Sequence, residues 1–431
     1  GPAGLSCAFY LAEKGYSPVI FEKNENPGGM LRYGIPSFKL EKDVIDAEID
    51  IIKAMGVEIK CGIEVGKDVT LDELRAQGYK AFYIAIGCQG GRKAGIPGED
   101  AEGVMTAVDF LRTVGADESY PVTGKAVVVG GGNVAIDVAR TAQRCGAESV
   151  AMFCLEPRDK MPASEEEIAE ALEEDVTIDC GWGPKEILTE NGRVTGIVFK
   201  RCVSVWDKDG KFAPAYDEND TKTVPCDRVF LSIGQSILWG DLLKGSKVEL
   251  GRGNGAVADS LTYQTAEPDI FVGGDVYTGP IAAGREGAIS IHRFVQPHSS
   301  LTIGRNRREF IALDKDNIKV EQYDNASRQI PGTRKDVDHK KSFRDAKLPF
   351  TEEQVKAETA RCLGCGASVV DPNKCIGCGV CTTKCEFGAI KLHRERPECS
   401  NMIPSEKKLP YVLGNGAKQA LKIKFSKKKE Q

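Results

Sequence analysis

The chain has 431 residues, enough for about three domains, with an ordinary globular balance of 41% hydrophobic and 28% charged residues. Its net charge of −5 gives no case for nucleic-acid binding, and no apolar run is long enough to span a bilayer. No basic stretch followed by an apolar one opens the chain, so no secretory signal is visible. We expect a cytoplasmic protein that binds neither nucleic acid nor membranes.

The opening residues Gly1-Pro2-Ala3-Gly4 match the last two glycines of a G-x-G-x-x-G dinucleotide loop. Apolar residues at helical spacing follow and end at Gly15, and residues 18–22 then predict a buried strand. That strand ends in Glu22, about where an acid that binds a ribose hydroxyl is expected. Half a glycine motif is equally compatible with a simple turn. A Rossmann unit needs a strand ahead of its loop, so we also expect the natural chain to continue upstream.

A second unit begins at Lys125. Residues 126–129 predict a strand, residues 130–133 a tight loop and residues 134–145 a helix. Gly130-x-Gly132-x-x-Ala135 is therefore a complete dinucleotide loop in the context that its mechanism requires. Two such units in one chain indicate a flavin and a nicotinamide nucleotide held face to face.

A third signal is the strand predicted over residues 269–272, which runs into Gly273-Gly274-Asp275. An acid after a buried strand can reach the ribityl chain or the pyrophosphate of FAD, although strand-end turns are also common. Because this signal lies well downstream of the second unit, we infer that the NAD(P) domain is inserted in the FAD domain. The predicted class is α/β, with two Rossmann-like dinucleotide-binding domains and a small ferredoxin-like α+β iron–sulfur module.

The boundaries that follow from these signals divide the chain into six segments. They are an FAD-binding part over residues 1–124, an NAD(P)-binding domain over 125–240, a second FAD-binding part over 241–303, a linker over 304–350, a 4Fe-4S ferredoxin-like module over 351–400 and a basic tail over 401–431.

Cysteine usage indicates a metal centre. Of 15 cysteines, six crowd into one window: Cys362, Cys365, Cys375, Cys378, Cys381 and Cys385. Disulfide-stapled secreted folds are usually far shorter and spread their cysteines, so a reducing compartment with metal-bound thiols fits better.

The spacing Cys375-x2-Cys378-x2-Cys381-x3-Cys385 is typical of a 4Fe-4S cluster. Zinc is the rival, because Cys362/Cys365 and Cys375/Cys378 are also two C-x2-C pairs. The closely spaced third and fourth cysteines favour iron–sulfur.

A second cluster stays open. The stretch after Cys362 repeats the later motif, but Ser368 stands where a third cysteine is wanted, and Glu386 replaces the usual proline after the last one. A second cluster at Cys362 and Cys365 would have to recruit Ser368, Asp371, Cys399 or a group from elsewhere.

With these motifs in place, the chain resembles the glutamate synthase small subunit-like FAD/NAD(P) oxidoreductases. Relatives in that family include the N-terminal half of dihydropyrimidine dehydrogenase and the large subunit of bifurcating ferredoxin:NADP oxidoreductase. The matching stretches are residues 26–36 (NPGGMLRYGIP), 96–100 (IPGED), 130–140, 161–163 (MPA) and 273–275 (GGD).

The resemblance implies the contacts to each cofactor. For FAD they are the loop formed by Gly1, Pro2, Ala3 and Gly4, then Glu22, Gly29, Leu31, Arg32, Gly87, Gly274, Asp275, Ala283 and Gly284. For the nicotinamide nucleotide they are Gly130, Gly132, Asn133, Val134, Ala135 and Gly234.

The choice of nucleotide rests on one position. NADPH-using relatives tend to place two arginines where this chain has Leu155 and Glu156. An acid there accepts hydrogen bonds from a ribose 2′-hydroxyl and repels a phosphate, which favours NAD(H) over NADP(H). Arg158 and Lys160 are close in sequence and offer the alternative of a phosphate site.

The sequence thus predicts an NAD(P)H-dependent FAD/iron–sulfur oxidoreductase of anaerobic type. It would move hydride between NAD(P)H and FAD, and single electrons between FAD and a 4Fe-4S cluster, for ferredoxin or for redox subunits of a larger complex. No side chain is assigned a catalytic role, because the cofactors carry the chemistry. Two alternatives stay open: a self-contained reductase of a small substrate, with an activity of the glutamate synthase β type, and a structural subunit with a vestigial nucleotide site.

Overall fold

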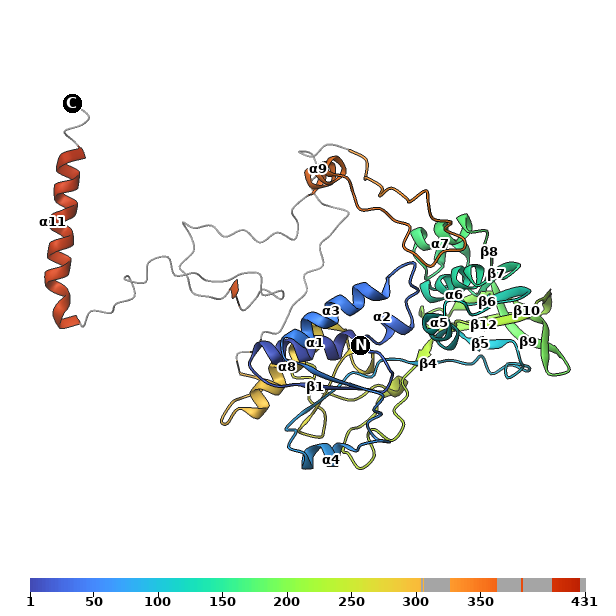
Figure 1. The fold of residues 1–431 in the computed structure, drawn as a ribbon, viewed down its shortest axis with the longest axis horizontal. Helices are drawn as coiled ribbons and strands as arrows, with labels where there is room; N and C mark the ends of the chain where they lie inside the picture. The colour runs from blue at the N-terminus through green and yellow to red at the C-terminus, as the bar shows by residue number, and fades with distance from the viewer. Residues whose placement is uncertain (304, 306–325, 363–380, 383–404, 427–431) are drawn as a thin grey trace. The chain divides into compact units, whose positions relative to one another are not determined.

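The computed structural model describes residues 1–303, 305, 326–362, 381–382 and 405–426 (Figure 1). The chain divides into two compact units, Gly1–Cys365 and Gly366–Gln431.

The FAD region of the first unit is built from two pairs of parallel strands and the helices beside them. β1 pairs with β2, and β3 pairs with β14. Helices α1 and α8 lie against each other, and α3 packs on α1 (Figure 1). The elements are α1 (Pro2–Glu13), β1 (Val19–Glu22), α2 (Met30–Tyr33), α3 (Lys42–Ala54), β2 (Glu58–Cys61), α4 (Leu71–Ala76), β3 (Phe82–Ile84), β14 (Ile270–Val272), η3 (Gly274–Val276) and α8 (Ile281–Val295).

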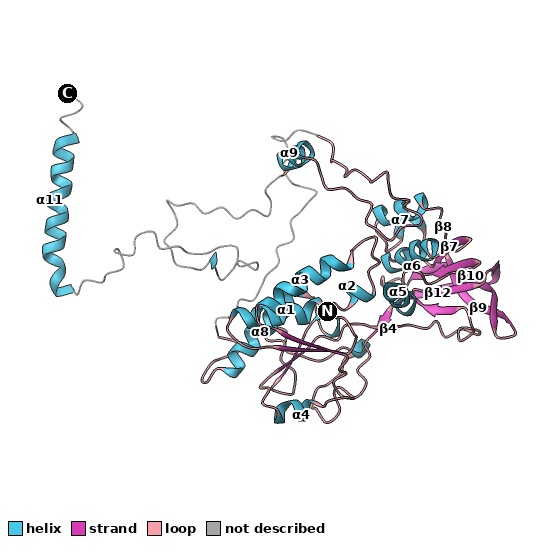
Figure 2. Ribbon diagram, in the orientation of Figure 1, coloured by secondary structure: helices cyan, strands magenta, loops and turns pink. Residues whose placement is uncertain are grey.

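The NAD(P) region is a five-stranded parallel sheet in the order β5-β12-β6-β7-β8, next to a three-stranded antiparallel sheet, β11-β10-β9 (Figure 2). Its elements are β5 (Val104–Thr106), α5 (Ala107–Ala116), β6 (Lys125–Val129), α6 (Asn133–Arg144), β7 (Ser149–Cys154), η1 (Arg158–Lys160), α7 (Glu165–Glu173), β8 (Thr177–Cys180), β9 (Trp182–Glu190), β10 (Arg193–Trp206), β11 (Phe212–Pro225) and β12 (Arg228–Leu231).

Both faces of the parallel sheet are buried, which explains why β6 reads as an unbroken apolar run. Ala126 and Val128 pack on the side of α5, α6 and α7, whereas Val127 and Val129 pack on the side of β9 and β10. β5 lies in the predicted first FAD-binding part but belongs to this sheet, because it pairs with β12, and α5 packs against both strands.

The chain passes between the two regions through one antiparallel crossing, formed by β4 (Gly90–Gly91) and β13 (Gln235–Ser236). Only glycine fits in β4. A Cβ at Gly91 would lie 2.1 Å from the Oγ1 of Thr106, and one at Gly90 would lie 2.6 Å from the Oγ of Ser236. The pairing of β4, which leads into the NAD(P) region, with β13, which leads back, therefore fixes where the NAD(P) region joins the FAD region.

Residues 326–350, from the predicted linker, form an irregular segment that packs on the NAD(P) region. Phe343 packs against the core formed by α5, α6 and α7. Arg144 donates from Nε to the carbonyl oxygen of Ser342 at 2.9 Å, and Lys347 pairs with Glu166 at 3.0 Å. The helix α9 (Glu352–Arg361) follows.

In the second unit, the structure describes a short 3-10 turn, Ser405–Lys407, and the helix α11 (Lys408–Ser426). Across the described residues, no helix is both long and apolar enough to cross a membrane.

Candidate cofactor-binding site

The first glycine loop is framed by backbone on two sides. Gly29 has φ +59°, and a Cβ added there would lie 2.6 Å from the Cα of Gly1. A Cβ at Gly284 would lie 2.5 Å from the carbonyl oxygen of Ala3. Pro2 occupies the first turn of α1, where its missing N–H and its fixed φ suit a helix start. This arrangement keeps side chains away from the positive end of α1, as a pyrophosphate requires.

Glu22 ends β1 and is buried with only 9% of its surface exposed. Its Oε1 accepts hydrogen bonds from the backbone N of Asn24 at 3.0 Å and from Asn24 Nδ2 at 2.8 Å. No hydrogen bond to Oε2 occurs among the described residues. The carboxylate is therefore held by one oxygen, and the other can accept from a ribose hydroxyl.

Asp275 lies in η3, directly after β14, and its side chain is exposed. Its Oδ2 accepts from the backbone N of Cys88 at 3.4 Å and lies 3.5 Å from where a Cβ of Gly87 would be. Gly274 has φ +71° and approaches Ala3 of α1. Because β1, β3 and β14 all end near the start of α1, the predicted FAD contacts Glu22, Gly87 and Asp275 share one edge of the region.

Three further predicted FAD contacts have structural partners of their own. Leu31 packs with the core between α1 and α3, and Ala283 is buried in α8. Arg32 donates from Nε to the carbonyl oxygen of Pro27 at 3.0 Å and pairs with Asp46.

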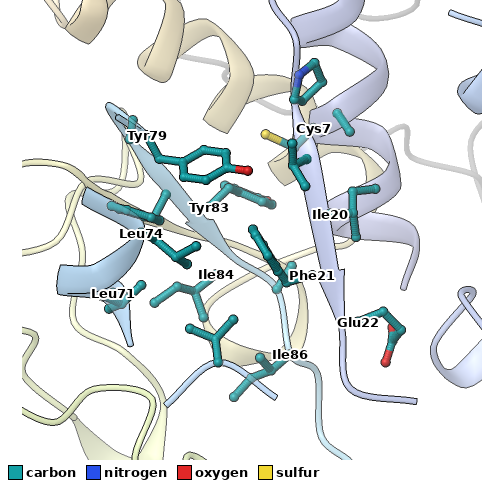
Figure 3. A pocket seen from close by; sticks show the side chains of 18 of the residues that line it. Cys7, Ile20, Phe21, Glu22, Leu71, Leu74, Tyr79, Tyr83, Ile84 and Ile86 are labelled. Carbon is teal, nitrogen blue, oxygen red and sulfur yellow. The ribbon is translucent and has the colours of Figure 1, made fainter. Parts of the chain in front are cut away.

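A cavity of about 470 Å³ separates β1 from β3 (Figure 3). Its polar end holds Gly1, Gly4, Glu22 and Gly87. Its body is apolar and includes Cys7, Phe21, Leu71, Leu74, Tyr83 and Ile84. Among the described strands, β1 pairs only with β2 and β3 only with β14, so no ladder crosses the cavity.

The two ends of this cavity suit different occupants. The polar end fits the ribose and pyrophosphate of FAD. The apolar body, lined by consecutive residues of two strands that do not pair with each other, fits an extended backbone better than a flavin ring, whose polar edge needs hydrogen-bonding partners.

The second glycine loop shows which of its glycines the fold needs and which a ligand needs. Gly130 has φ +143°, and a Cβ there would lie 2.3 Å from the carbonyl oxygen of Ser232. Gly132 is the N-cap of α6, has φ −92°, and nothing lies within 4 Å of its added Cβ. Ala135 is fully buried against the sheet, whereas Asn133 and Val134 are exposed at the helix start. The open side of Gly132 fits a bound phosphate.

Glu156 follows β7 and points at this loop, since a Cβ on Gly131 would lie 3.1 Å from Glu156 Oε2. Arg158 is bound to Glu165, with Nη1 to Oε1 at 3.1 Å and Nη2 to Oε2 at 2.9 Å. The acid, rather than the nearby arginine, therefore faces the glycine loop.

Sequence reasoning missed Arg92 and Arg252. The backbone N of Arg92 donates to the carbonyl oxygen of Gly234 at 3.2 Å, next to the crossing. A second cavity, of about 310 Å³, is lined by Arg92, Arg252, Ser236 and Asp275. The sequence signal was available for Arg92, which directly follows the Gly90-Gly91 pair.

Two side chains tie the FAD region to the NAD(P) region. Lys39 forms ion pairs with Asp137 of α6 and Glu167 of α7. Burial raises the pKa of Asp137 to about 6, against the opposing effect of Lys39. The ring of Phe38 lies beneath the guanidinium of Arg144, 3.9 Å from its centre. These contacts join the segment before α3 to α6 and α7.

Most of the predicted cluster ligands lie outside the described residues, namely Cys365, Cys375, Cys378 and Cys385. Cys362 caps α9 and is exposed, and Cys381 is half-buried.

Comparison with known proteins assigns the family. A model of the pyridine nucleotide-disulphide oxidoreductases matches residues 1–290, and a model of the 4Fe-4S binding domain matches residues 368–391. The chain belongs to the pyridine nucleotide-disulphide oxidoreductase family and carries a 4Fe-4S domain. The predicted fold class, family and enzyme class are confirmed, because the members of this family are NAD(P)H-dependent oxidoreductases.

Three curated relatives illustrate the range. The NADP(+)-dependent formate dehydrogenase subunit beta of Moorella thermoacetica is 35% identical over 85% of this chain and 53% of its own length. The NADPH-Fe(3+) oxidoreductase subunit beta of Geobacter sulfurreducens is 31% identical, with 85% and 60% covered. The NAD-dependent dihydropyrimidine dehydrogenase subunit PreT of Escherichia coli O157:H7 is 35% identical, with 69% and 67% covered. The chain spans about half the length of the first of these.

Among solved structures, FprA of Mycobacterium tuberculosis in complex with NADPH matches with a TM-score of 0.58 at 18% identity, over 68% of this chain and 82% of that one. The thioredoxin reductase of Lactococcus lactis matches with a TM-score of 0.52 at 20% identity, over 68% and 96%. At these identities, the likeness concerns the fold alone.

Proposed function

We propose that this chain is a flavoprotein electron-transfer subunit, which takes hydride from a nicotinamide nucleotide and passes single electrons to ferredoxin or to a partner redox subunit. FAD supplies the conversion between hydride and single electrons, and the 4Fe-4S cluster carries those electrons onward. The family and the 4Fe-4S domain support this proposal.

The residues of the chain bind and orient. The start of α1, kept bare by Gly1, Gly4 and Gly29, holds the pyrophosphate of FAD, and Glu22 accepts from its ribose. Asp275 lies beside Gly87, where it can hold the ribityl chain. The start of α6, with Gly132 open, holds the pyrophosphate of the nicotinamide nucleotide.

One observation carries the proposal. The cavity at the crossing is lined by Asp275 from the FAD region, by Arg92, which directly follows β4, and by Ser236 of β13. A flavin held by Asp275 and a nucleotide held near Gly234 would therefore meet at one place, which is what direct hydride transfer requires.

We further propose that the nucleotide is NADH. Glu156 faces the glycine loop, while Arg158 is already paired with Glu165. A 2′-phosphate placed there would meet a carboxylate, whereas a 2′-hydroxyl would donate to it.

A cytoplasmic setting fits the proposal, because a cluster bound by cysteine thiolates must be assembled from reduced thiols. The names of the relatives as subunits support a larger redox complex, whose other members hold the terminal acceptor.

The experiment is anaerobic stopped-flow mixing of the purified protein with NADH or NADPH, recording the flavin absorbance and then the cluster signal. We expect rapid flavin bleaching, followed by reduction of an added ferredoxin. A protein that holds FAD but is not reduced by either nucleotide contradicts the proposal. Reduction of a small organic substrate without any protein acceptor would favour the self-contained reductase.

A further inference from the structure

Three sulfur atoms lie together at the carboxyl edge of the NAD(P) sheet. The Sγ atoms of Cys154 and Cys180 are 3.7 Å apart, and the Sγ of Cys180 is 3.9 Å from the Sδ of Met161. These residues play no part in the cofactor contacts predicted from the sequence. They lie in the NAD(P) region, away in sequence from the cysteines of the 4Fe-4S motif.

The backbone places the two thiols for direct bonding. Cys154 ends β7, Cys180 ends β8, and the two are register partners in a parallel ladder. Neighbouring strands lie about 4.8 Å apart, which is inside the usual Cα–Cα range of a disulfide, about 4.4–6.8 Å. Register partners also project to the same face of the sheet. Bond formation therefore needs rotation of the two side chains, with little movement of the strands.

From this geometry we propose that Cys154 and Cys180 form a reversible disulfide, which acts as a redox-sensitive modification site beneath the nucleotide loop. Because Cys180 is half-buried, a small thiol can reach the bond and reduce it again by thiol–disulfide exchange.

The oxidant is a low-molecular-weight disulfide, RSSR. Cys180 is half-buried and Cys154 is fully buried, so Cys180 reacts first. Its thiolate attacks one sulfur of RSSR and releases one thiol, RSH, leaving a mixed disulfide. The Cys154 thiol then gives up its proton as its sulfur attacks Sγ of Cys180, and the leaving group takes that proton and departs as the second RSH. In total, two protein thiols lose two electrons and two protons, and one RSSR becomes two RSH.

The position of Cys154 couples this bond to the nucleotide loop. A Cβ on Gly131 would lie 2.9 Å from the Cβ of Cys154, so the loop rests on this residue. The Sγ of Cys154 also lies 3.5 Å from the carbonyl oxygen of Glu156. Turning that sulfur toward Cys180 breaks its contact with Glu156 and changes the packing of Cys154 beneath the loop at Gly131. This consequence rests on the proposed function, in which the loop binds a nicotinamide nucleotide.

A metal ion fits the same atoms less well. Within the described part of the chain, no group of three or more His, Cys, Asp or Glu side chains forms a metal site. Two thiols and one thioether would leave a tetrahedral ion incompletely bound by the protein.

The first test detects the bond itself, whatever the loop binds. The anaerobic full-length protein is treated with oxidised glutathione, alkylated, digested with trypsin and analysed by mass spectrometry. We expect the peptide 145–158 joined to the peptide 161–185, with fragmentation locating the bond at Cys154 rather than at Cys145. Dithiothreitol should reverse it. Glutathione bound to half-buried Cys202 shows that the oxidant has reached thiols of this exposure. If Cys154 and Cys180 are still free in that sample, the proposal is overturned. Stoichiometric zinc bound at Cys154 and Cys180 would also overturn it.

The second test measures the consequence. Oxidation is expected to raise the KM for the nucleotide in flavin reduction by about tenfold, equivalent to about 1.4 kcal/mol, at unchanged FAD content. Cys180→Ser should abolish this sensitivity, and the matched control Cys202→Ser should keep it. A wild type that forms the bond with unchanged KM overturns the coupling. If neither redox form is reduced by a nucleotide, the proposed function fails while the mapped bond stands.

Discussion

The guanidinium of Arg144 binds both carboxylate oxygens of Glu174, at 2.5 Å from Nη1 and 2.8 Å from Nη2. Arg140 binds the same carboxylate at 2.8 and 3.1 Å. Arg144 also donates to Ser342, in the segment that leads toward α9. One buried carboxylate thus organises α6, the end of α7 and the segment before the 4Fe-4S domain.

Glu174→Gln is expected to destabilise the NAD(P) region strongly. Removing the charge leaves buried Arg144 without its anion and Arg140 with Glu170 as its remaining close partner, a loss of about 3–5 kcal/mol. Thermal and urea unfolding measure it. The control Glu165→Gln removes an exposed pair with Arg158 and should leave stability unchanged. Equal effects of both substitutions would contradict a special role for Glu174.

The same carboxylate predicts a pH dependence. Burial favours the neutral acid, but hydrogen bonds from Arg144 and Arg140 outweigh it and hold the pKa of Glu174 below its ordinary value. A carboxyl group with a lowered folded-state pKa stabilises the fold above its unfolded-state pKa and loses that contribution as the pH falls. We expect Glu174→Gln to flatten the acid limb of the stability profile below about pH 5. A limb as steep as that of the wild type would refute this.

Gly130→Ala and Gly132→Ala should separate folding from binding within one loop. Gly130→Ala places a Cβ on a residue with φ +143° and against the backbone of Ser232. We therefore expect the free energy of unfolding to fall by about 1–3 kcal/mol. Gly132 has an ordinary φ, and nothing lies near the position of its added Cβ. Gly132→Ala should therefore leave the melting temperature unchanged, while the KM for the nucleotide rises about tenfold. A Gly132→Ala protein with normal KM would place the pyrophosphate elsewhere.

Glu156→Arg is expected to shift the nucleotide preference. The wild type should reduce its flavin faster with NADH, because the acid repels a 2′-phosphate. In the variant, the ratio of kcat/KM for NADH to that for NADPH should fall by about tenfold or more. Arg158→Ala serves as the control, since Arg158 is paired with Glu165. A wild type that clearly prefers NADPH would reverse the assignment and point to Arg158 and Lys160.

Cys378→Ala should remove the cluster and spare the hydride step. Anaerobic protein should contain iron and sulfide, with a reduced EPR signal that the variant lacks, because a 4Fe-4S cluster needs its thiolate ligands. Flavin bleaching by the nucleotide should persist at the wild-type rate, while transfer to ferredoxin stops. Stoichiometric zinc without sulfide in the wild type would exclude the cluster.

Local patterns were enough for the parts whose neighbours lie close in sequence. The run Ala126–Val129, the loop at Gly130 and the buried Ala135 predict a strand, a turn and a helix within a dozen residues, and each is present. The cysteine motif works in the same way, because its ligand spacing is itself the signal, and a 4Fe-4S model matches there. The packing of residues 326–350 on the NAD(P) region left no such local signal.

The sequence by itself determined the family, the two nucleotide-binding units and the iron–sulfur motif, since short-range spacing specifies backbone turns and ligand sets. Only the tertiary structure decided which groups meet: Glu156 rather than Arg158 facing the glycine loop, Lys39 reaching Asp137, and Cys154 beside Cys180. Those contacts depend on strand register and on the packing of helices that are far apart in sequence. Such long-range pairing leaves no periodic pattern in the sequence.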